Sequence, residues 1–82
     1  MITYLWGDHD SIEIDPATGV ATATRLGSDH IVAEAEPDQG AEILSDGRFL
    51  VVTSLDEGWT VDVTEPPDGD FVAQVAYVPF PD

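Results

Sequence analysis

The 82-residue chain contains no cysteine, no lysine and only two arginines. Without cysteine, disulfides, zinc sites built on thiolates and thiol nucleophiles are all excluded. The only imidazoles are those of His9 and His30, so any chemistry that needs a histidine depends on these two residues.

Positive charge is scarce beside seventeen Asp and Glu residues, which give a formal net charge of −15. Proteins that bind nucleic acid without sequence preference, or that bind anionic membranes, depend on clusters of Lys and Arg. We therefore expect no direct nucleic-acid contact and no membrane contact. The expected partner is a basic protein surface.

Long apolar runs are also missing. The N-terminal apolar run ends at Trp6, and no basic segment precedes it, so we expect it to be neither a signal peptide nor a membrane span. Hydrophobic residues make up 43% of the chain, which is enough for one small core. We expect a single acidic β domain over residues 1–82, located in the cytoplasm, or in the host cytoplasm if the protein is viral.

The main pattern in the sequence is an alternation of apolar and polar residues. It is clearest in residues 59–64, where Trp59, Val61 and Val63 alternate with polar residues and predict a strand with these three on its core face. Similar runs are rich in β-branched and aromatic residues. They predict eight short strands, at residues 2–6, 11–14, 20–26, 30–36, 42–44, 48–55, 59–64 and 71–78.

Turn signals separate these strands. The pattern acid-Pro-x-x-Gly occurs at residues 15–19, 36–40 and 65–69. Proline fixes φ at the first central turn position, and glycine accepts the left-handed conformation that returns the chain. The spacing predicts an all-β fold, a small antiparallel meander of about seven or eight short strands rolled into a barrel or a compact sandwich.

Residues 37–46 allow a second interpretation. Pro37 suits the first position of a helix and Gly47 would follow its end, so a short helix over residues 37–46 is the alternative. Gly40 opposes a helix, and Asp46-Gly47 is a hairpin signal. We therefore expect at most one short helix.

Two predicted strands, residues 48–55 and 71–78, carry apolar residues on both faces. A strand of this kind is buried on both sides in a rolled sheet, or it presents one face to another protein. The pattern favours partner binding, including self-association through these strands.

In an up-and-down meander, successive turns alternate between the two ends of the sheet. One end is then more acidic and holds both histidines. Its expected residues are Asp8, His9, Asp10, Asp29, His30, Asp46, Glu65, Asp68 and Asp70, and those of the other end are Asp15, Glu36, Asp38, Asp56 and Glu57.

Catalytic and metal-binding motifs are absent from the sequence. Acidic residues flank both histidines, but neither EF-hand spacing nor His-Glu-x-x-His is present. Ser11 and Ser28 lie near the histidines, yet the chain has no Gly-x-Ser-x-Gly motif. We expect no enzyme activity, no metal and no cofactor.

The acidic residues lead to the functional hypothesis. Glu34 and Glu36 occupy alternate positions of a predicted strand, so their side chains point the same way about 6.7 Å apart. We predict a non-catalytic acidic binding protein that blocks a basic, nucleic-acid-facing surface of a target protein, as an inhibitor, antidote or nucleic-acid mimic. The predicted partner-binding residues are Glu34, Glu36, Asp38, Asp8, Asp10, Asp68 and Asp70.

Composition supports a different explanation of the charge. Lysine is absent, Asp outnumbers Glu, and Ala, Val and Thr are abundant, which is typical of proteins adapted to high salt. The alternative hypothesis is therefore a structural module of a virion or complex, such as a decoration or connector protein, from a high-salt or high-GC host.

Overall fold

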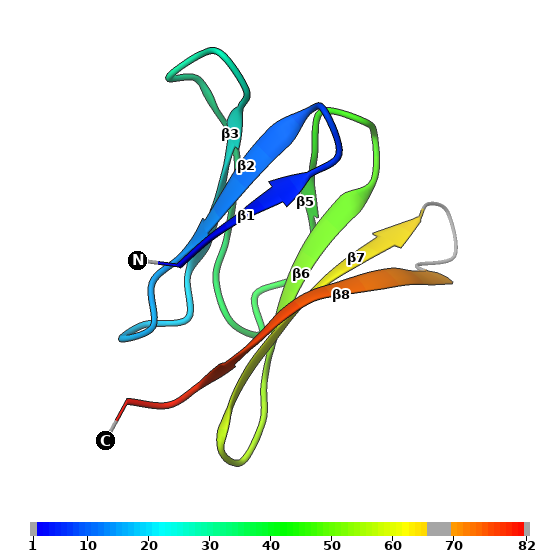
Figure 1. Ribbon diagram of the computed structural model, residues 1–82. Helices are drawn as coiled ribbons and strands as arrows, with labels where there is room; N and C mark the ends of the chain where they lie inside the picture. The colour runs from blue at the N-terminus through cyan, green and yellow to red at the C-terminus, as the bar shows by residue number, and fades with distance from the viewer. Residues whose placement is uncertain (1, 66–69, 82) are drawn as a thin grey trace.

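The computed structural model describes residues 2–65 and 70–81, which form eight strands and no helix (Figure 1). The strands are β1 (Ile2–Trp6), β2 (Asp10–Ile14), β3 (Ala21–Arg25), β4 (Ile31–Ala35), β5 (Glu42–Ile43), β6 (Phe49–Ser54), β7 (Gly58–Glu65) and β8 (Asp70–Pro79). The predicted all-β fold is confirmed, and each predicted strand ends within one residue of an observed one. The alternative helix over residues 37–46 is not formed, because β5 and a turn occupy its second half.

The strands form two antiparallel sheets, sheet A with the order β1-β2-β3-β4 and sheet B with the order β5-β6-β7-β8. Neighbouring strands are consecutive in sequence, so each sheet is a meander, and the chain passes from one sheet to the other between β4 and β5. Of the two predicted forms, the sandwich describes this arrangement best. None of the described residues belongs to a helix that could cross a membrane.

The core lies between the two inner faces. It consists of the buried residues Ile12, Ile14, Ala21, Ala23, Ala33, Ala35, Leu44, Leu50, Val52, Trp59, Val61, Val63, Ala76 and Val78. The predicted inward face of residues 59–64 is thereby confirmed. Because β3 and β4 contribute only alanines to this core, most of its large side chains come from β2 and sheet B.

The Trp59 ring packs where the β2–β3 turn meets sheet B. Gly19 in that turn has a φ of 77°, and a Cβ added there would lie 2.6 Å from the ring. Phe80 contacts the ring edge-to-face with a centroid distance of 4.6 Å. Glycine is therefore required at position 19 for two reasons, its backbone conformation and the space taken by Trp59.

Two bulges in β8 explain the apolar residues on both of its faces. Val61 pairs with Ala76 and Asp62 with Gln74, so Val75 is an extra residue, and a second irregularity leaves Val72 unpaired in the same way. Both valines are half-buried and pack against the core. Of the two alternatives for this strand, burial on both faces is therefore not observed, since the bulges turn its valines inward and leave Phe71 and Tyr77 exposed outside.

Candidate functional site

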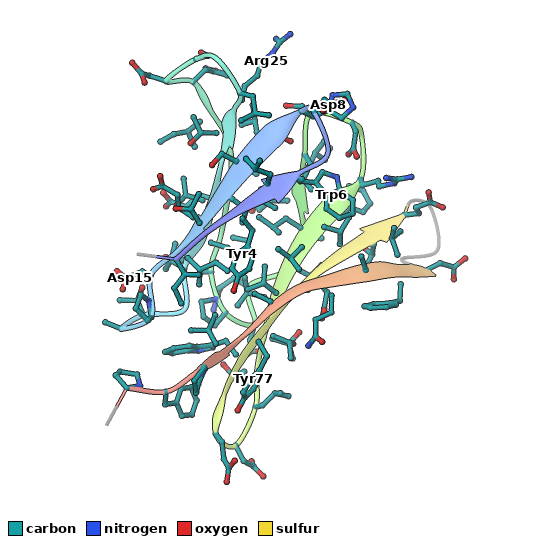
Figure 2. All side chains as sticks on the ribbon, in the orientation of Figure 1. Tyr4, Trp6, Asp8, Asp15, Arg25 and Tyr77 are labelled. Carbon is teal, nitrogen blue, oxygen red and sulfur yellow. The ribbon has the colours of Figure 1, made fainter. Side chains whose placement is uncertain are left out.

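The turns gather at two ends of the sandwich, which we call the mixed end and the acid-only end. The mixed end carries Asp8, His9, Arg25, Asp29, His30, Asp46, Arg48, Glu65 and Asp70, and the acid-only end carries Asp15, Glu36, Asp38, Asp56 and Glu57. Figure 2 shows Asp8 and Arg25 at one end of the molecule and Asp15 toward the other. Every Arg and His side chain of the sequence lies at the mixed end.

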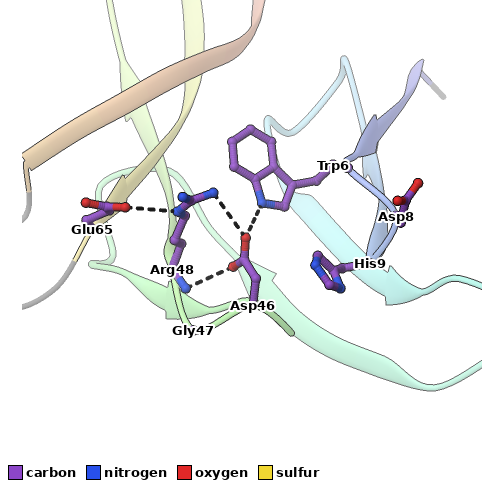
Figure 3. Close-up of a pocket in the computed structure, with 8 residues that line it drawn as sticks. Trp6, Asp8, His9, Asp46, Gly47, Arg48 and Glu65 are labelled. Carbon is purple, nitrogen blue, oxygen red and sulfur yellow. Dashed lines mark hydrogen bonds and ion pairs between the residues drawn. The ribbon is translucent and has the colours of Figure 1, made fainter.

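A cleft of about 840 Å³ opens at the mixed end between the β1–β2 turn of sheet A and the β5–β6 turn of sheet B (Figure 3). It is lined by Trp6, Gly7, Asp8, His9, Asp46, Gly47, Arg48 and Glu65. The predicted grouping of the acids and histidine of these turns is thus confirmed for Asp8, His9, Asp46 and Glu65.

Asp46 lies at the centre of this cleft. Its carboxylate accepts hydrogen bonds from Trp6 Nε1 at 2.7 Å and from the backbone N–H of Arg48 at 3.0 Å. Burial raises the pKa of Asp46, but these hydrogen bonds and the charges of Arg48 and His9 outweigh it and hold the pKa below its ordinary value. Asp46 therefore stays ionised and links β1 to the β5–β6 turn.

Arg48 is held by two carboxylates and an aromatic ring. Its Nη1 lies 3.5 Å from Asp46 Oδ2, its Nε lies 3.2 Å from Glu65 Oε1, and its Cζ lies 5.8 Å from the centroid of Trp6. Trp6, Asp46, Arg48 and Glu65 thus form one connected group of polar contacts within the cleft. Among the described residues, no buried side-chain nitrogen or oxygen lacks a hydrogen-bond partner.

The two histidines line a second cavity of about 480 Å³ beside the cleft, together with Arg25. Ser28, one of the two serines near a histidine in sequence, accepts a hydrogen bond from the backbone N–H of His30 at 3.0 Å. The other, Ser11, lies on the outer face of sheet A opposite Thr24. Within residues 2–65 and 70–81, no group of three or more acidic or histidine side chains is arranged to hold a metal ion.

Asp10 is the one predicted partner-binding residue that the structure removes from the surface. Its side chain is 0% exposed, Oδ2 accepts the backbone N–H of Ser45 at 3.0 Å, and Oδ1 accepts the Ser45 hydroxyl at 2.6 Å. Asp10 therefore connects β2 of sheet A to the β5–β6 turn of sheet B. The prediction that Asp10 contacts a partner is wrong, because its side chain has no accessible surface.

The other predicted partner-binding residues fall in two places. Asp8 and Asp70 are exposed at the mixed end, and Asp68 lies outside the described residues, with most of the turn at 65–69. Glu34, Glu36 and Asp38 are exposed along β4 and the connection that follows it.

Glu34 has an acidic neighbour that the sequence analysis did not select. Glu13 pairs with Thr22, and Thr22 pairs with Glu34, so the two glutamates lie in one row on the outer face of sheet A, about 10 Å apart. The signal was present in the sequence, since Glu13 alternates with the buried Ile12 and Ile14. We call Glu13, Glu34, Glu36 and Asp38 the acidic surface.

Asp38 is fixed at the end of this surface. Its backbone N–H donates to the Val52 carbonyl at 2.9 Å, and its Oδ1 accepts the Ser54 N–H at 3.1 Å. The hydrogen bonds from Ser54 lower the pKa of Asp38 below its ordinary value. Asp38 has a φ of 60°, a conformation that aspartate tolerates better than most residues.

No family model, curated protein or solved structure matches this chain. Its function is therefore argued from its own residues.

Proposed function

We propose that this chain is a non-catalytic acidic binding protein that covers a basic, nucleic-acid-facing surface of a target protein, as an inhibitor, antidote or nucleic-acid mimic. The observation that supports the proposal is the separation of charge. All Arg and His side chains lie at the mixed end, while Glu34, Glu36 and Asp38 are exposed away from them.

Concentration of charge is necessary for such a role. Spread over the accessible surface of 4871 Å², the net charge of −15 amounts to about one charge per 320 Å². DNA, treated as a cylinder of about 10 Å radius, carries about one per 110 Å². A mimic must therefore collect its carboxylates on one face, and the acidic surface is the place in this fold where exposed glutamates share a sheet face.

The mixed end has a smaller part in this proposal. The two Arg side chains offset the field of its carboxylates, and Arg48 is already paired with Asp46 and Glu65. Asp8 lines the same cavities as Arg48 and Arg25. No arginine or histidine lies in β4 or the connection that follows it, which carry three of the four residues of the acidic surface, so we expect this surface to steer a basic partner more strongly than Asp8 and Asp70 do.

The test begins with a pull-down from the source organism and continues with the association kinetics of the captured protein. Capture of a nuclease, toxin or DNA-binding protein that DNA displaces from the chain supports the proposal. The association rate should fall about tenfold between low and moderate salt, as expected for steering by charge.

A pair of charge-matched variants then locates the contact. Glu34→Gln with Glu36→Gln should slow association about three- to tenfold. Asp8→Asn with Asp70→Asn removes the same charge from the mixed end and should have a smaller effect. Equal effects of the two double variants would contradict the assignment of the contact to the acidic surface.

The structural alternative is a decoration or connector module of a virion or complex. It is supported by large apolar side chains exposed on the outer face of sheet B. Recovery of the chain with assembled particles, in an association that salt does not weaken, would favour this alternative over the inhibitor.

A further inference from the structure

The outer face of sheet B is nearly free of charge although the chain carries seventeen acids. Ile43 pairs with Phe49, Phe49 with Thr64, and Thr64 with Phe71, so one row of this face crosses all four strands. Ile43 is 60% exposed, Phe71 65% and Tyr77 46%. We call Ile43, Phe49, Val51, Asp62, Phe71 and Tyr77 the apolar face.

Asp62 is the one carboxylate within this face. It pairs with Val51 on β6 and with Gln74 on β8, so its strand neighbours on both sides are uncharged. Burial raises the pKa of Asp62 above its ordinary value, against the opposing effect of a hydrogen bond with Thr60. The carboxylate is thus partly shielded from solvent and has no cationic partner among the described residues.

These features restrict what can cover the face. Exposed apolar patches of this kind commonly mark contacts with other macromolecules. A neutral apolar surface laid over Asp62 would bury a charge without compensation, which is strongly unfavourable. A complementary surface must therefore bring a cation to this position.

A second copy of the chain does not meet that requirement. Two copies related by a twofold axis through the middle of the face would bring two Asp62 carboxylates close together. Each copy also carries a net charge of −15, and the two would repel each other.

We propose that the apolar face is the docking site for a partner protein whose contact surface is apolar around one Arg or Lys side chain, which pairs with Asp62. The apolar face lies on the outer side of sheet B, away from Glu13 and Glu34 on the outer side of sheet A, and the proposal does not rest on the proposed function. The two surfaces differ in kind, since the partner of the apolar face is held by apolar contact and oriented by a single ion pair.

The proposal is tested with two synthetic cyclic β-hairpins. One hairpin presents Leu and Val around a central Arg, and the other has citrulline, the uncharged analogue, in place of Arg. Each is titrated into the isotopically labelled chain while the backbone amide shifts are followed by NMR. We expect shifts on β6, β7 and β8 and binding of the Arg hairpin that is about tenfold tighter than that of the citrulline hairpin.

Two variants isolate the role of Asp62. Asp62→Asn should bind both hairpins with equal affinity, and Glu13→Gln, which removes the same charge from the outer face of sheet A, should keep the preference for Arg. Amide spectra of both variants establish that the fold is retained. The proposal is overturned if the wild-type chain binds neither hairpin or binds both equally, or if the shifts fall on β2, β3 and β4 around Glu13 and Glu34.

Sedimentation of the chain alone tests whether a second copy of the chain covers the apolar face. A monomer at the concentrations used for NMR agrees with the proposal. A dimer whose formation shifts the same amides of β6, β7 and β8 would assign the apolar face to self-association and overturn it.

Discussion

The outer faces of the two sheets follow the same alternation but differ in chemistry. On sheet A the outward rows are Thr3, Glu13, Thr22 and Glu34, and then Leu5, Ser11, Thr24 and Ile31. On sheet B the corresponding positions hold Phe49, Val51, Phe71 and Tyr77 around a single carboxylate, Asp62. Each sheet buries its inner face in the core, so the side chains of its outer face are available to bind a partner. The glutamates of the first face would bind a partner through salt-sensitive charge, whereas the apolar side chains of the second would bind through contact area.

The inner faces differ as well. Sheet A lines the core with alanines from β3 and β4, whereas sheet B contributes Leu50, Val61 and Trp59. Truncating a large buried side chain costs more stability than replacing a buried alanine, so substitutions on the inner faces of sheet B and of β2 should be more destabilising than those on β3 and β4.

The largest expected effect separates the two faces of β7. Val61 is fully buried, and Val61→Asp would place an uncompensated charge in the core at a cost of about 3–5 kcal/mol. Asp62→Val lies one residue away on the apolar face and should cost nothing. Urea denaturation measures both, and similar losses of stability would show that the assignment of faces in β7 is wrong.

A smaller effect is expected where the β2–β3 turn of sheet A meets Trp59 of sheet B. Gly19→Ala combines a strained positive φ with a clash against the indole, and should cost about 2–4 kcal/mol. Gly27 is the matched control, because it has a φ of 78° but no atom within 4 Å of an added Cβ. Gly27→Ala should cost about 1–2 kcal/mol from the backbone alone. Thermal melts that rank the two variants equally would contradict the packing of Trp59 on the turn.

The hydrogen bonds between Asp10 and Ser45 join the sheets at the mixed end. Ser45→Ala removes the hydroxyl donor to a fully buried carboxylate and should cost about 1–3 kcal/mol. Ser28→Ala, in an exposed turn, should change stability by no more than about 0.5 kcal/mol. Chemical denaturation of both variants gives the comparison, and a negligible effect at Ser45 would show that Asp10 has another partner.

The smallest effects are pH-dependent and opposite in sign at Asp46 and Asp62. The pKa of Asp46 is lowered in the fold, so its stabilising contribution is present above its unfolded pKa and is lost as pH falls through its folded pKa. The pKa of Asp62 is raised in the fold, so this residue favours the folded state at low pH. That stabilisation is present below the pKa of Asp62 in the unfolded chain and is lost as pH rises through its pKa in the fold.

Neutral variants reveal these signs. Near pH 7, Asp46→Asn should lower the melting temperature and Asp62→Asn should raise it. Each substitution should change the free energy of unfolding by less than about 1 kcal/mol. Both differences should narrow once the pH is low enough to protonate the two carboxyls. Melting curves recorded between acidic and neutral pH provide the measurement. Changes in melting temperature of the same sign for the two variants would contradict the prediction.

Many residues of the site could be predicted from the local sequence, and some were predicted wrongly. The alternation of turns placed Asp8, His9, Asp46 and Glu65 at one end, where they line the cleft. Asp10 shares its alternation with Ile12 and Ile14, a signal that it faces inward. By contrast, no local pattern connects Trp6 with Asp46, which lies forty positions along the chain and receives its hydrogen bond.

The sequence by itself determined the all-β class, the positions of the strands and turns, the absence of thiol chemistry and the sign of the charge. These properties depend on composition and on the alternation of neighbouring residues, which act over a few positions of the chain. Only the tertiary structure decided the division into two sheets, the bulges that turn Val72 and Val75 inward, the burial of Asp10 against Ser45 and the hydrogen bond from Trp6 to Asp46. These depend on which distant segments pair and pack, and the free energies that select them arise from contacts that local alternation does not encode.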